Sequence, residues 1–356
     1  MMKIIFIIPS LSTGGAEKVV STITDGLSLK FNITLLSFYQ CDKEYFINKK
    51  IKRIVLAKDE KQYKTYSKIW KIKKIRNIIK NEQPDKIICF LNYVCIYTFI
   101  SLLFSKYRKR IIFTERSNQK YYSKSMWFLK KLFSKFIDKI ILQNTGQQKL
   151  FSKKIKKKSF IIPNLIYNGY LEYKKEFSNV PKHIISIGRL SEQKDYPLAI
   201  NAFNNVLKKF PNLLYHIYGK GEDMEKIESL IKELNLEGKV ILEGFTTDIH
   251  KVYENADIYL MTSKFEGMPN ALAESLAIGI PSISTDCEFG PSDLIDNESM
   301  GILVKEHSIK AIEKALIHMI ENYNYYVSKS NYVKETMKDR YSLEKITDEW
   351  IKVLEK

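Results

Sequence analysis

Residues 258–274 read IYLMTSKFEGMPNALAE, and the order of residue types in this stretch decides the fold. The first four residues are apolar, as in a strand that is buried on both faces of a parallel sheet. A polar loop with Gly267 and Pro269 follows, and then come the small and apolar residues of a helix that packs on such a sheet. A strand that leads through a loop into a covering helix is the repeating unit of a doubly wound α/β domain.

The same alternation runs along the whole chain and restarts once, after a polar stretch at residues 167–181. The length of 356 residues suits two domains of about 150–180 residues each. We expect strands at residues 3–9, 33–38, 51–56, 87–91, 110–114, 139–142 and 159–163 before this stretch, and at 183–187, 214–218, 240–243, 258–261 and 281–284 after it. We expect helices at residues 16–29, 66–80, 197–209 and 224–234, among others.

The expected fold class is α/β, with two Rossmann-like doubly wound domains that face each other across a cleft. The N-terminal domain should comprise residues 1–168 and the C-terminal domain residues 169–340, with a helix at about 341–356 that packs back on the first domain. Ligands of such sheets bind outside the carboxyl ends of the strands. The loops that follow the strands are therefore the places to look for chemistry.

Residues 87–104 contain no formal charge, and by length alone they could form a short transmembrane helix. Pro84 and Asp85 just before them resemble a loop that enters a buried strand, and polar Thr98 and Ser101 would lie unfavourably in lipid. We expect a strand followed by a buried helix over residues 93–104, with Asn92 as the helix N-cap.

The four cysteines lack C-x-x-C spacing, and Met1 leads directly into an apolar strand. We expect buried thiols in a reducing compartment and no signal peptide. The charge is divided unevenly: residues 1–180 carry 37 Lys and Arg against 12 Asp and Glu, a net charge of +25, whereas residues 181–356 carry 21 against 28, a net charge of −7. The first half could face anionic lipid, a diphosphate-linked substrate or nucleic acid, although a biased overall composition would also raise its charge.

The strongest chemical signal is a pair of glutamates, Glu266 at the mouth of a loop and Glu274 about two turns inside the helix that follows. Between them, Met268 and Asn270 would present backbone amides at the helix start. Two carboxylates and these amides can hold a polyol at several hydroxyl groups.

Other loops add weaker signals. Arg189 and Lys194 follow the strand at 183–187 and could stabilise a leaving diphosphate without a metal ion, although a solvated loop explains them too. Gly15 and Gly219 stand in glycine-rich turns after strands, where the backbone can approach a ligand closely or simply turn.

Together these residues resemble the retaining glycosyltransferases of family 4, whose bacterial members build surface polysaccharide or lipid-linked oligosaccharide on the two-domain GT-B fold. The resemblance covers the whole chain. It rests on the Gly14-Gly15-Ala16-Glu17 loop, the Gly188-Arg189 to Lys194 segment, the turn Tyr218-Gly219-Lys220-Gly221 and the glutamate pair.

The resemblance implies that the C-terminal domain binds the nucleotide sugar. Arg189 and Lys194 would hold the donor diphosphate, Glu266 would contact the transferred sugar, and Glu274 would bond to the ribose. The loop Glu243-Gly244-Phe245 resembles the base-binding loop of the family, and Gly15 would approach the diphosphate from the acceptor-binding N-terminal domain. Many relatives carry a histidine that contacts the sugar where this chain has Arg116. Arg116 could take over this catalytic contact, with Glu115 or Asn118 in part of the role, or it could simply contact an acceptor phosphate or lie at the surface.

The implied reaction is front-face displacement with retention, in which the leaving diphosphate accepts the proton of the acceptor hydroxyl. It requires positioning and electrostatic stabilisation rather than a protein nucleophile. We expect no metal and no cofactor besides the donor, a UDP-linked hexose or N-acetylhexosamine. The expected acceptor is a saccharide on a polyprenyl diphosphate.

Residues 126–137 mix Trp, Phe and Leu with Lys at near-helical spacing, which suits either a bilayer interface or a core-packed helix with a solvated lysine face. We expect a cytoplasmic protein held at the inner face of the membrane by anionic lipid. An epimerase or phosphorylase of the same fold is the nearest alternative. A nucleic-acid-binding protein is a remote one, since no helix-turn-helix, zinc-finger or RNP pattern is found.

Overall fold

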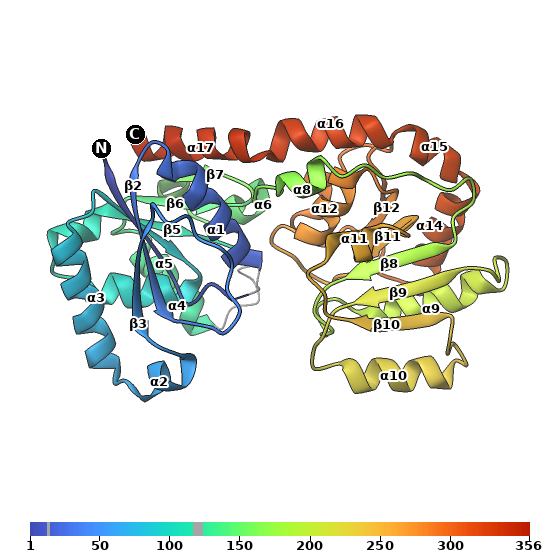
Figure 1. Ribbon diagram of the computed structural model, residues 1–356, viewed down its shortest axis with the longest axis horizontal. Helices are drawn as coiled ribbons and strands as arrows, with labels where there is room; N and C mark the ends of the chain where they lie inside the picture. The colour runs from blue at the N-terminus through green and yellow to red at the C-terminus, as the bar shows by residue number, and fades with distance from the viewer. Residues whose placement is uncertain (13–14, 117–123) are drawn as a thin grey trace. The chain divides into compact units, whose positions relative to one another are not determined.

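The computed structural model describes residues 1–12, 15–116 and 124–356 (Figure 1). The chain divides into two compact units. The first comprises Met1–Leu165 together with Leu343–Lys356, and the second comprises Ile166–Ser342. Each unit contains one parallel sheet with helices on both faces, which is the predicted α/β class.

The sheet of the first unit has the strand order β3-β2-β1-β4-β5-β6-β7. Its strands are β1 (Lys3–Ile8), β2 (Asn32–Tyr39), β3 (Lys52–Ala57), β4 (Lys86–Phe90), β5 (Ile111–Thr114), β6 (Lys139–Leu142) and β7 (Ser159–Ile161). The helices of this unit are α1 (Gly15–Ser28), α2 (Glu60–Thr65), α3 (Lys68–Glu82), α4 (Asn92–Ser101), α5 (Lys124–Phe133), α6 (Thr145–Lys149), α7 (Lys153–Lys156) and α17 (Leu343–Glu355), with a 3₁₀ helix at Lys106–Arg110.

The central strand β1 shows why a continuous apolar run is needed here. Ile5 and Ile7 point to the core on one face, and Ile4, Phe6 and Ile8 point to the core on the other. A strand alternates its side chains between faces, so burial on both faces requires apolar residues at every position.

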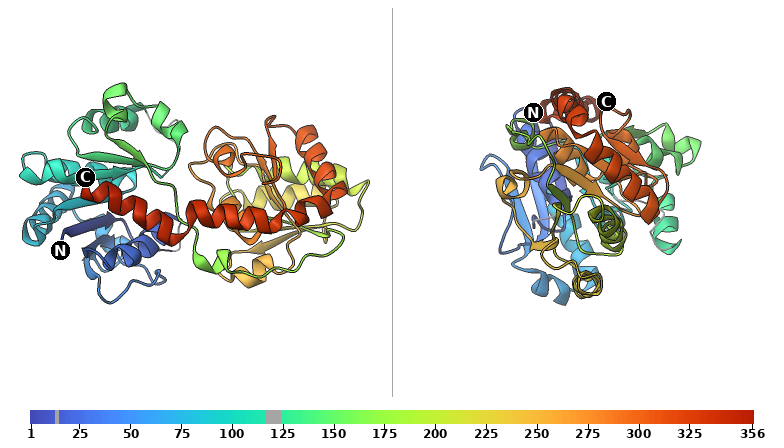
Figure 2. Two further views of the ribbon diagram at one scale, coloured as in Figure 1. Left: turned by 90° about the horizontal axis from the view of Figure 1, so that it is seen from above. Right: turned by 90° about the vertical axis from the view of Figure 1, so that its right-hand side faces the viewer.

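The C-terminal helix α17 completes the core of the first unit. Trp350 is fully buried, and its ring lies 6.1 Å from that of Phe6 and 6.3 Å from that of Phe90. Figure 2 shows α17, in red, against the blue elements of this unit. On α1, a Cβ atom at Gly26 would lie 2.7 Å from the hydroxyl of Thr347, so the two helices pack too closely for a side chain there.

The sheet of the second unit has the order β10-β9-β8-β11-β12-β13. Its strands are β8 (His183–Ile187), β9 (Leu214–Tyr218), β10 (Val240–Gly244), β11 (Ile258–Met261), β12 (Ser282–Thr285) and β13 (Ile302–Val304). Its helices are α8 (Asn168–Leu171), α9 (Tyr196–Leu207), α10 (Met224–Glu233), α11 (Ile249–Tyr253), α12 (Asn270–Ile278), α13 (Pro291–Leu294), α14 (Ile309–Glu321), α15 (Tyr323–Ser328) and α16 (Ser330–Tyr341).

Residues 87–104 form β4 and α4, as predicted, and none of the helices in the described parts of the chain is long and apolar enough to cross a membrane. The prediction that Asn92 caps the helix is wrong. The N-cap is Leu91, whose side chain makes no capping hydrogen bond, and the helix ends at Ser101 rather than 104. The helix expected from residue 66 begins at Lys68, because the Ser67 hydroxyl accepts a hydrogen bond from the Trp70 amide and acts as the cap.

We predict that Trp350→Ala lowers the free energy of unfolding of the first unit by about 3–5 kcal/mol, because it leaves a cavity between α17 and the sheet. Urea unfolding followed by circular dichroism measures the change. Lys352→Ala, at an exposed position of the same helix, is the control and should change stability by less than about 0.5 kcal/mol. Equal stability of the two variants would mean that α17 is not part of this core.

Candidate functional site

The sheet order places a topological switch point between β8 and β11 in the second unit. The chain moves outward from β8 to β9 and β10 on one side, and from β11 to β12 and β13 on the other. The loops that follow β8 and β11 therefore leave the sheet side by side in opposite directions, and a crevice forms outside the strand ends at such a point. Most of the predicted site residues lie on these two loops or next to them.

Lys194 and Glu266 bring the two loops together. The Lys194 Nζ atom lies 2.6 Å from the Glu266 Oε1 atom, and the side chains are only 17% and 9% exposed. The predicted roles are separate, Lys194 at the diphosphate and Glu266 at the sugar, and the ion pair between them is not among the predictions. A buried ion pair is stable only where further hydrogen bonds hold its geometry.

Backbone contacts supply that support. The Thr262 hydroxyl donates to the carbonyl oxygens of Lys194 and Asp195, at 3.0 and 3.1 Å. The Gln193 side-chain amide donates to the Phe265 carbonyl at 2.8 Å, and the Lys264 amide donates to the Gln193 carbonyl at the same distance. These hydrogen bonds hold the loop after β8 against the loop after β11.

Glycines let the neighbouring loops approach. A Cβ atom at Gly219 would lie 1.9 Å from the carbonyl oxygen of Gly188, and one at Gly221 would lie 2.1 Å from that of Leu190. The Leu190 amide also donates to the Lys220 carbonyl at 3.0 Å. Packing of the two loops against each other is therefore a sufficient reason for glycine at position 219.

A third loop, which is not among the predicted site loops, packs against the loop that carries Glu266. Gly290 follows β12 in a left-handed conformation (φ 98°), and a Cβ atom there would lie 2.6 Å from Pro269 and 2.7 Å from the Gly267 carbonyl oxygen. The sequence signal was the Gly290-Pro291 pair just after a strand. Any side chain at position 290 would displace the loop that carries Glu266.

The glutamate pair lies on both sides of the start of α12. Glu274 is the fifth residue of this helix, just over one turn from its start rather than two, and it is half-buried. Asn270 is the first helical residue, and the cap residue Pro269 makes no side-chain capping bond. Met268 lies just before it and is half-buried. The start of α12 is therefore directed to the same edge of the sheet as Glu266.

Arg189 is more open than Lys194. Its side chain is 74% exposed, and its Nε atom lies 3.7 Å from a carboxylate oxygen of Glu222.

Gly244 has a left-handed backbone (φ 73°), and its carbonyl accepts a hydrogen bond from the Gly219 amide at 2.8 Å. Phe245, next to it, is 52% exposed. The predicted residues between 188 and 274 thus lie on or next to neighbouring loops at one edge of the second sheet.

The first unit carries the other two predicted residues. Arg116 follows β5. One of its terminal nitrogens donates to the Asn164 side chain at 2.6 Å, and its guanidinium lies 4.9 Å from the centre of the Phe90 ring. Burial lowers the pKa of Arg116 to about 9, and its Nε and Nη2 atoms are enclosed without a hydrogen-bond partner in the part of the chain that the structure describes. Gly15 is the first residue of α1 and is exposed, whereas Gly14 and Asn118 lie outside the described residues.

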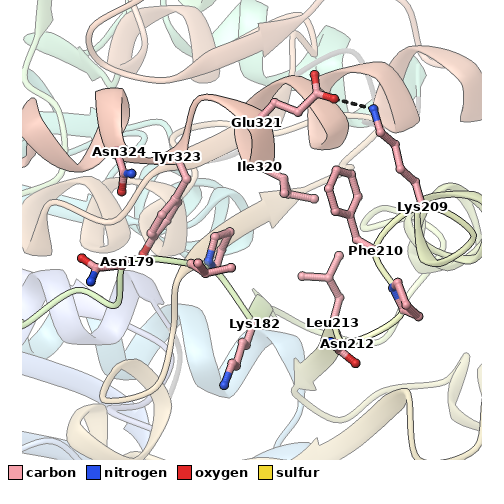
Figure 3. Close-up of a pocket in the computed structure, with 13 residues that line it drawn as sticks. Asn179, Lys182, Lys209, Phe210, Asn212, Leu213, Ile320, Glu321, Tyr323 and Asn324 are labelled. Carbon is pink, nitrogen blue, oxygen red and sulfur yellow. Dashed lines mark hydrogen bonds and ion pairs between the residues drawn. The ribbon is translucent and has the colours of Figure 1, made fainter.

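A pocket of about 370 Å³ lies at the opposite edge of the second sheet (Figure 3). It contains none of the predicted site residues, and Lys209 in its wall is paired with Glu321. The pocket is lined by Asn179, Val180, Pro181, Lys182, Lys209, Phe210, Pro211, Asn212, Leu213, Ile320, Glu321, Tyr323 and Asn324. Because Lys182 and Leu213 come just before β8 and β9, this pocket is at the amino ends of the strands, away from the switch point.

Comparison with known proteins agrees with this geometry. Residues 171–336 match the family described as Glycosyl transferases group 1. A Campylobacter jejuni protein named GalNAc-alpha-(1->4)-GalNAc-alpha-(1->3)-diNAcBac-PP-undecaprenol alpha-1,4-N-acetyl-D-galactosaminyltransferase is 26% identical over 99% of this chain and 98% of its own length. The amylovoran biosynthesis glycosyltransferase AmsD of Erwinia amylovora is 22% identical over 84% of this chain and 85% of its own.

Solved structures with the same fold include two complexes that contain UDP. Anabaena HepE in complex with UDP superposes with a TM-score of 0.81 at 16% identity, over 99% of this chain and 100% of its own. A variant of Staphylococcus aureus TarM, in a complex that also holds UDP, gives 0.81 at 14% identity over the full length of both chains. At these identities the structures establish the fold alone. Residues 171–336 of the chain are thus similar to the group 1 glycosyltransferases, and the whole chain has the two-domain GT-B fold that its sequence predicts.

Proposed function

We propose that this glycosyltransferase is retaining and metal-independent. It moves a hexose or an N-acetylhexosamine from a nucleotide sugar, linked to UDP, to a saccharide carried on a polyprenyl diphosphate. The observation that carries the proposal is the buried Lys194–Glu266 pair at the switch point of the second sheet, with Glu274 on the helix that follows.

The donor diphosphate would lie against Lys194 and Arg189. An ammonium group has three donors, so Lys194 can bond to Glu266 and to a diphosphate oxygen together. Arg189 lies in the same loop after β8, and its side chain is exposed to solvent. Its guanidinium presents hydrogen-bond donors in a plane, an arrangement that suits phosphate. Two cations in a partly buried site offset the charge that develops on a leaving diphosphate, the task that a divalent metal ion performs elsewhere.

The sugar and the nucleoside would lie on either side of this diphosphate. Glu266, held in place by Lys194, would accept hydrogen bonds from hydroxyls of the transferred sugar. Glu274 would accept them from the ribose, the amides near Met268 and Asn270 would face the donor from the start of α12, and the base would contact Gly244 and Phe245. The leaving diphosphate would then accept the proton of the acceptor hydroxyl on the same face, and the configuration would be retained.

The relatives support the donor and acceptor classes. The name of the Campylobacter protein describes transfer of N-acetylgalactosamine to a saccharide on undecaprenyl diphosphate, and HepE was solved with UDP. By analogy, we place this chain in the synthesis of a bacterial surface glycan. Arg116 would contact the donor sugar or an acceptor phosphate, because two of its guanidinium nitrogens are enclosed without a partner among the described residues and suit an anionic or hydroxyl oxygen.

An acceptor saccharide that is carried on a polyprenyl diphosphate would lie at a membrane surface. On and just after α5, four apolar side chains are exposed, with lysines between them, as in helices that lie in a bilayer interface. They are Phe128, Leu129, Leu132 and Phe136, and the exposed lysines are Lys131 and Lys135. The side chains of Trp127 and Lys130, which also entered the prediction, lie outside those described. We propose that this segment holds the enzyme, on the cytoplasmic side, to anionic lipid.

Glu274→Ala should raise the KM for the nucleotide sugar by about 10–100-fold, because charge-assisted hydrogen bonds to the ribose are lost. Glu266→Gln should chiefly lower kcat, because the amide keeps a contact with Lys194 but removes the negative charge near the reacting sugar. Initial rates over a range of donor concentration separate the two effects, and melting temperatures check that each variant is folded. If both variants kept near-wild-type kcat/KM, the assignment of the glutamates would be wrong.

Treatment with EDTA should leave the transfer rate unchanged, because Lys194 and Arg189 supply the positive charge at the diphosphate. Lys194→Ala should lower kcat by about 100-fold or more, and added magnesium or manganese should not restore it. The rate of UDP release measures both effects. Loss of activity in EDTA that either metal reverses would contradict metal independence.

Replacing Lys131 and Lys135 with Glu should release the protein from anionic vesicles, because each basic residue near the surface contributes about 1 kcal/mol. Co-sedimentation with phosphatidylglycerol vesicles, at low and at physiological salt, measures the binding. The control is the same double charge reversal at Lys153 and Lys154, exposed on the same unit but away from α5 in sequence. Equal release by both double variants would show that net charge alone, rather than this segment, holds the protein.

A further inference from the structure

Five aromatic side chains gather at the carboxyl edge of the first sheet. We call them the aromatic cluster: Phe38, Tyr39, Tyr63, Tyr93 and Tyr97. The first two close β2, Tyr63 lies on α2 after β3, and the last two lie on α4 after β4. Because β3, β2, β1 and β4 are consecutive in the sheet, these segments leave it next to one another.

The rings form a connected group around Phe38. The Tyr63 ring stacks on Phe38 at a centroid distance of 5.3 Å, and the Tyr93 and Tyr97 rings lie 6.1 and 6.4 Å from Phe38. The Tyr39 ring lies 5.8 Å from that of Tyr63. These separations are those of favourable aromatic pairs.

The cluster is more polar and more open than a core needs to be. Phe38 is fully buried, but Tyr93 is 38% exposed, and Tyr39 and Tyr97 are half-buried. The Tyr63 ring is more than nine-tenths buried, and its hydroxyl has no hydrogen-bond partner among the described residues. A buried hydroxyl without a partner carries a free-energy cost that a phenylalanine would avoid.

Charged groups of both signs border the cluster. Burial raises the pKa of Tyr39, and so does the charge of Glu60. Burial likewise raises the pKa of Glu17, which lies in the first turn of α1 after β1. The Lys71 Nζ atom lies 4.0 Å from the centre of the Tyr63 ring. Carboxylates accept hydrogen bonds from hydroxyl groups, and an ammonium group donates hydrogen bonds to them.

A strained residue positions Tyr93. Leu91, between β4 and α4, has φ 70° and ψ 147°, a conformation that is nearly confined to glycine. Such a conformation costs about 1–3 kcal/mol and persists only where the surroundings impose it. Leu91 is the N-cap of α4, and Tyr93, two residues later, lies 6.1 Å from the Phe38 ring.

The site lies at the switch point of the first sheet. The strand order reverses between β1 and β4, and the segments after these strands carry Glu17 and Tyr93. This is where a parallel sheet binds its ligand. An aromatic face presents negative charge to C–H bonds, such as those on the apolar face of a pyranose ring, while phenol and carboxylate groups meet its hydroxyls.

We propose that the aromatic cluster is a saccharide subsite that binds a neutral pyranose ring of the acceptor, with Tyr93 as the stacking surface and the Tyr63 hydroxyl as a hydrogen-bonding group. The proposal rests on the proposed function, since it assumes that the acceptor is a saccharide.

Tyr93→Ala, Tyr93→Phe and Tyr63→Phe test the subsite. The probe is the free disaccharide GalNAc-α-(1→4)-GalNAc, and its binding is measured by saturation-transfer NMR from protein to the sugar protons. Tyr93→Ala should weaken binding about tenfold, and Tyr93→Phe should restore most of it, because the ring is kept. Tyr325→Ala, at a similarly exposed tyrosine of the second unit, should have no effect.

Tyr63→Phe separates binding from folding. If the hydroxyl serves the ligand, this variant should bind the disaccharide about threefold or more weakly while its melting temperature stays the same or rises, since an unpaired buried hydroxyl is removed. A purely structural role would not weaken binding without a loss of stability. No saturation transfer in the wild-type protein, or the same binding in all variants, would overturn the subsite.

Donor binding is measured in parallel, so that the two proposals fail separately. The shift of the melting temperature with UDP-N-acetylgalactosamine and with UDP-glucose should be the same in wild type and in the tyrosine variants. If neither nucleotide sugar shifts the wild-type melting temperature, the proposed function fails. If the donors bind but the disaccharide does not, only the subsite fails.

Discussion

The ion pair between Lys194 and Glu266 is the interaction on which the second unit depends for its site. It joins the loops after β8 and β11, the two neighbouring strands between which the chain order reverses. Removing both charges from water is costly, and removing one partner of such a pair commonly destabilises a protein by about 3–5 kcal/mol. The surrounding loops must therefore hold both groups in one geometry, and the backbone bonds from Thr262, Gln193 and Lys264 do so.

This constraint explains the glycines better than ligand contact alone. Gly219 and Gly290 are each needed because a neighbouring backbone atom occupies the place of their Cβ atoms. Their contacts fix the loops that carry Arg189 and Glu266, so a substitution at either position would move a charged side chain that it does not touch. Loops held in this way keep their charged side chains in a fixed geometry, and such fixed geometry is the condition for electrostatic stabilisation of a transition state.

Sequence alone was sufficient for the strands and insufficient for the contacts between loops. The strands at 183–187, 214–218 and 258–261 match β8, β9 and β11, because burial on both faces leaves an unbroken apolar run. The cap at residue 92 failed because the left-handed conformation of Leu91 is imposed by packing around β4 and α4, and no local pattern encodes it. The pairing of Lys194 with Glu266 joins residues 72 positions apart, and each has a separate local explanation. Glycine is needed at position 290 because the loop at Gly267 and Pro269 packs against it, and no sequence pattern around residue 290 indicates this contact.

The two sheets follow the same geometric rule with different chemistry. At the switch point of the second sheet, cations lie beside carboxylates, a combination suited to a diphosphate and a sugar. At the carboxyl edge of the first sheet, phenols lie near carboxylates, and the Lys71 ammonium group lies over the Tyr63 ring. Arg116, after β5, lies against Phe90 and Asn164. The side chains that follow parallel strands meet at one edge of the sheet, so the residue types in these loops decide which ligand chemistry each edge suits.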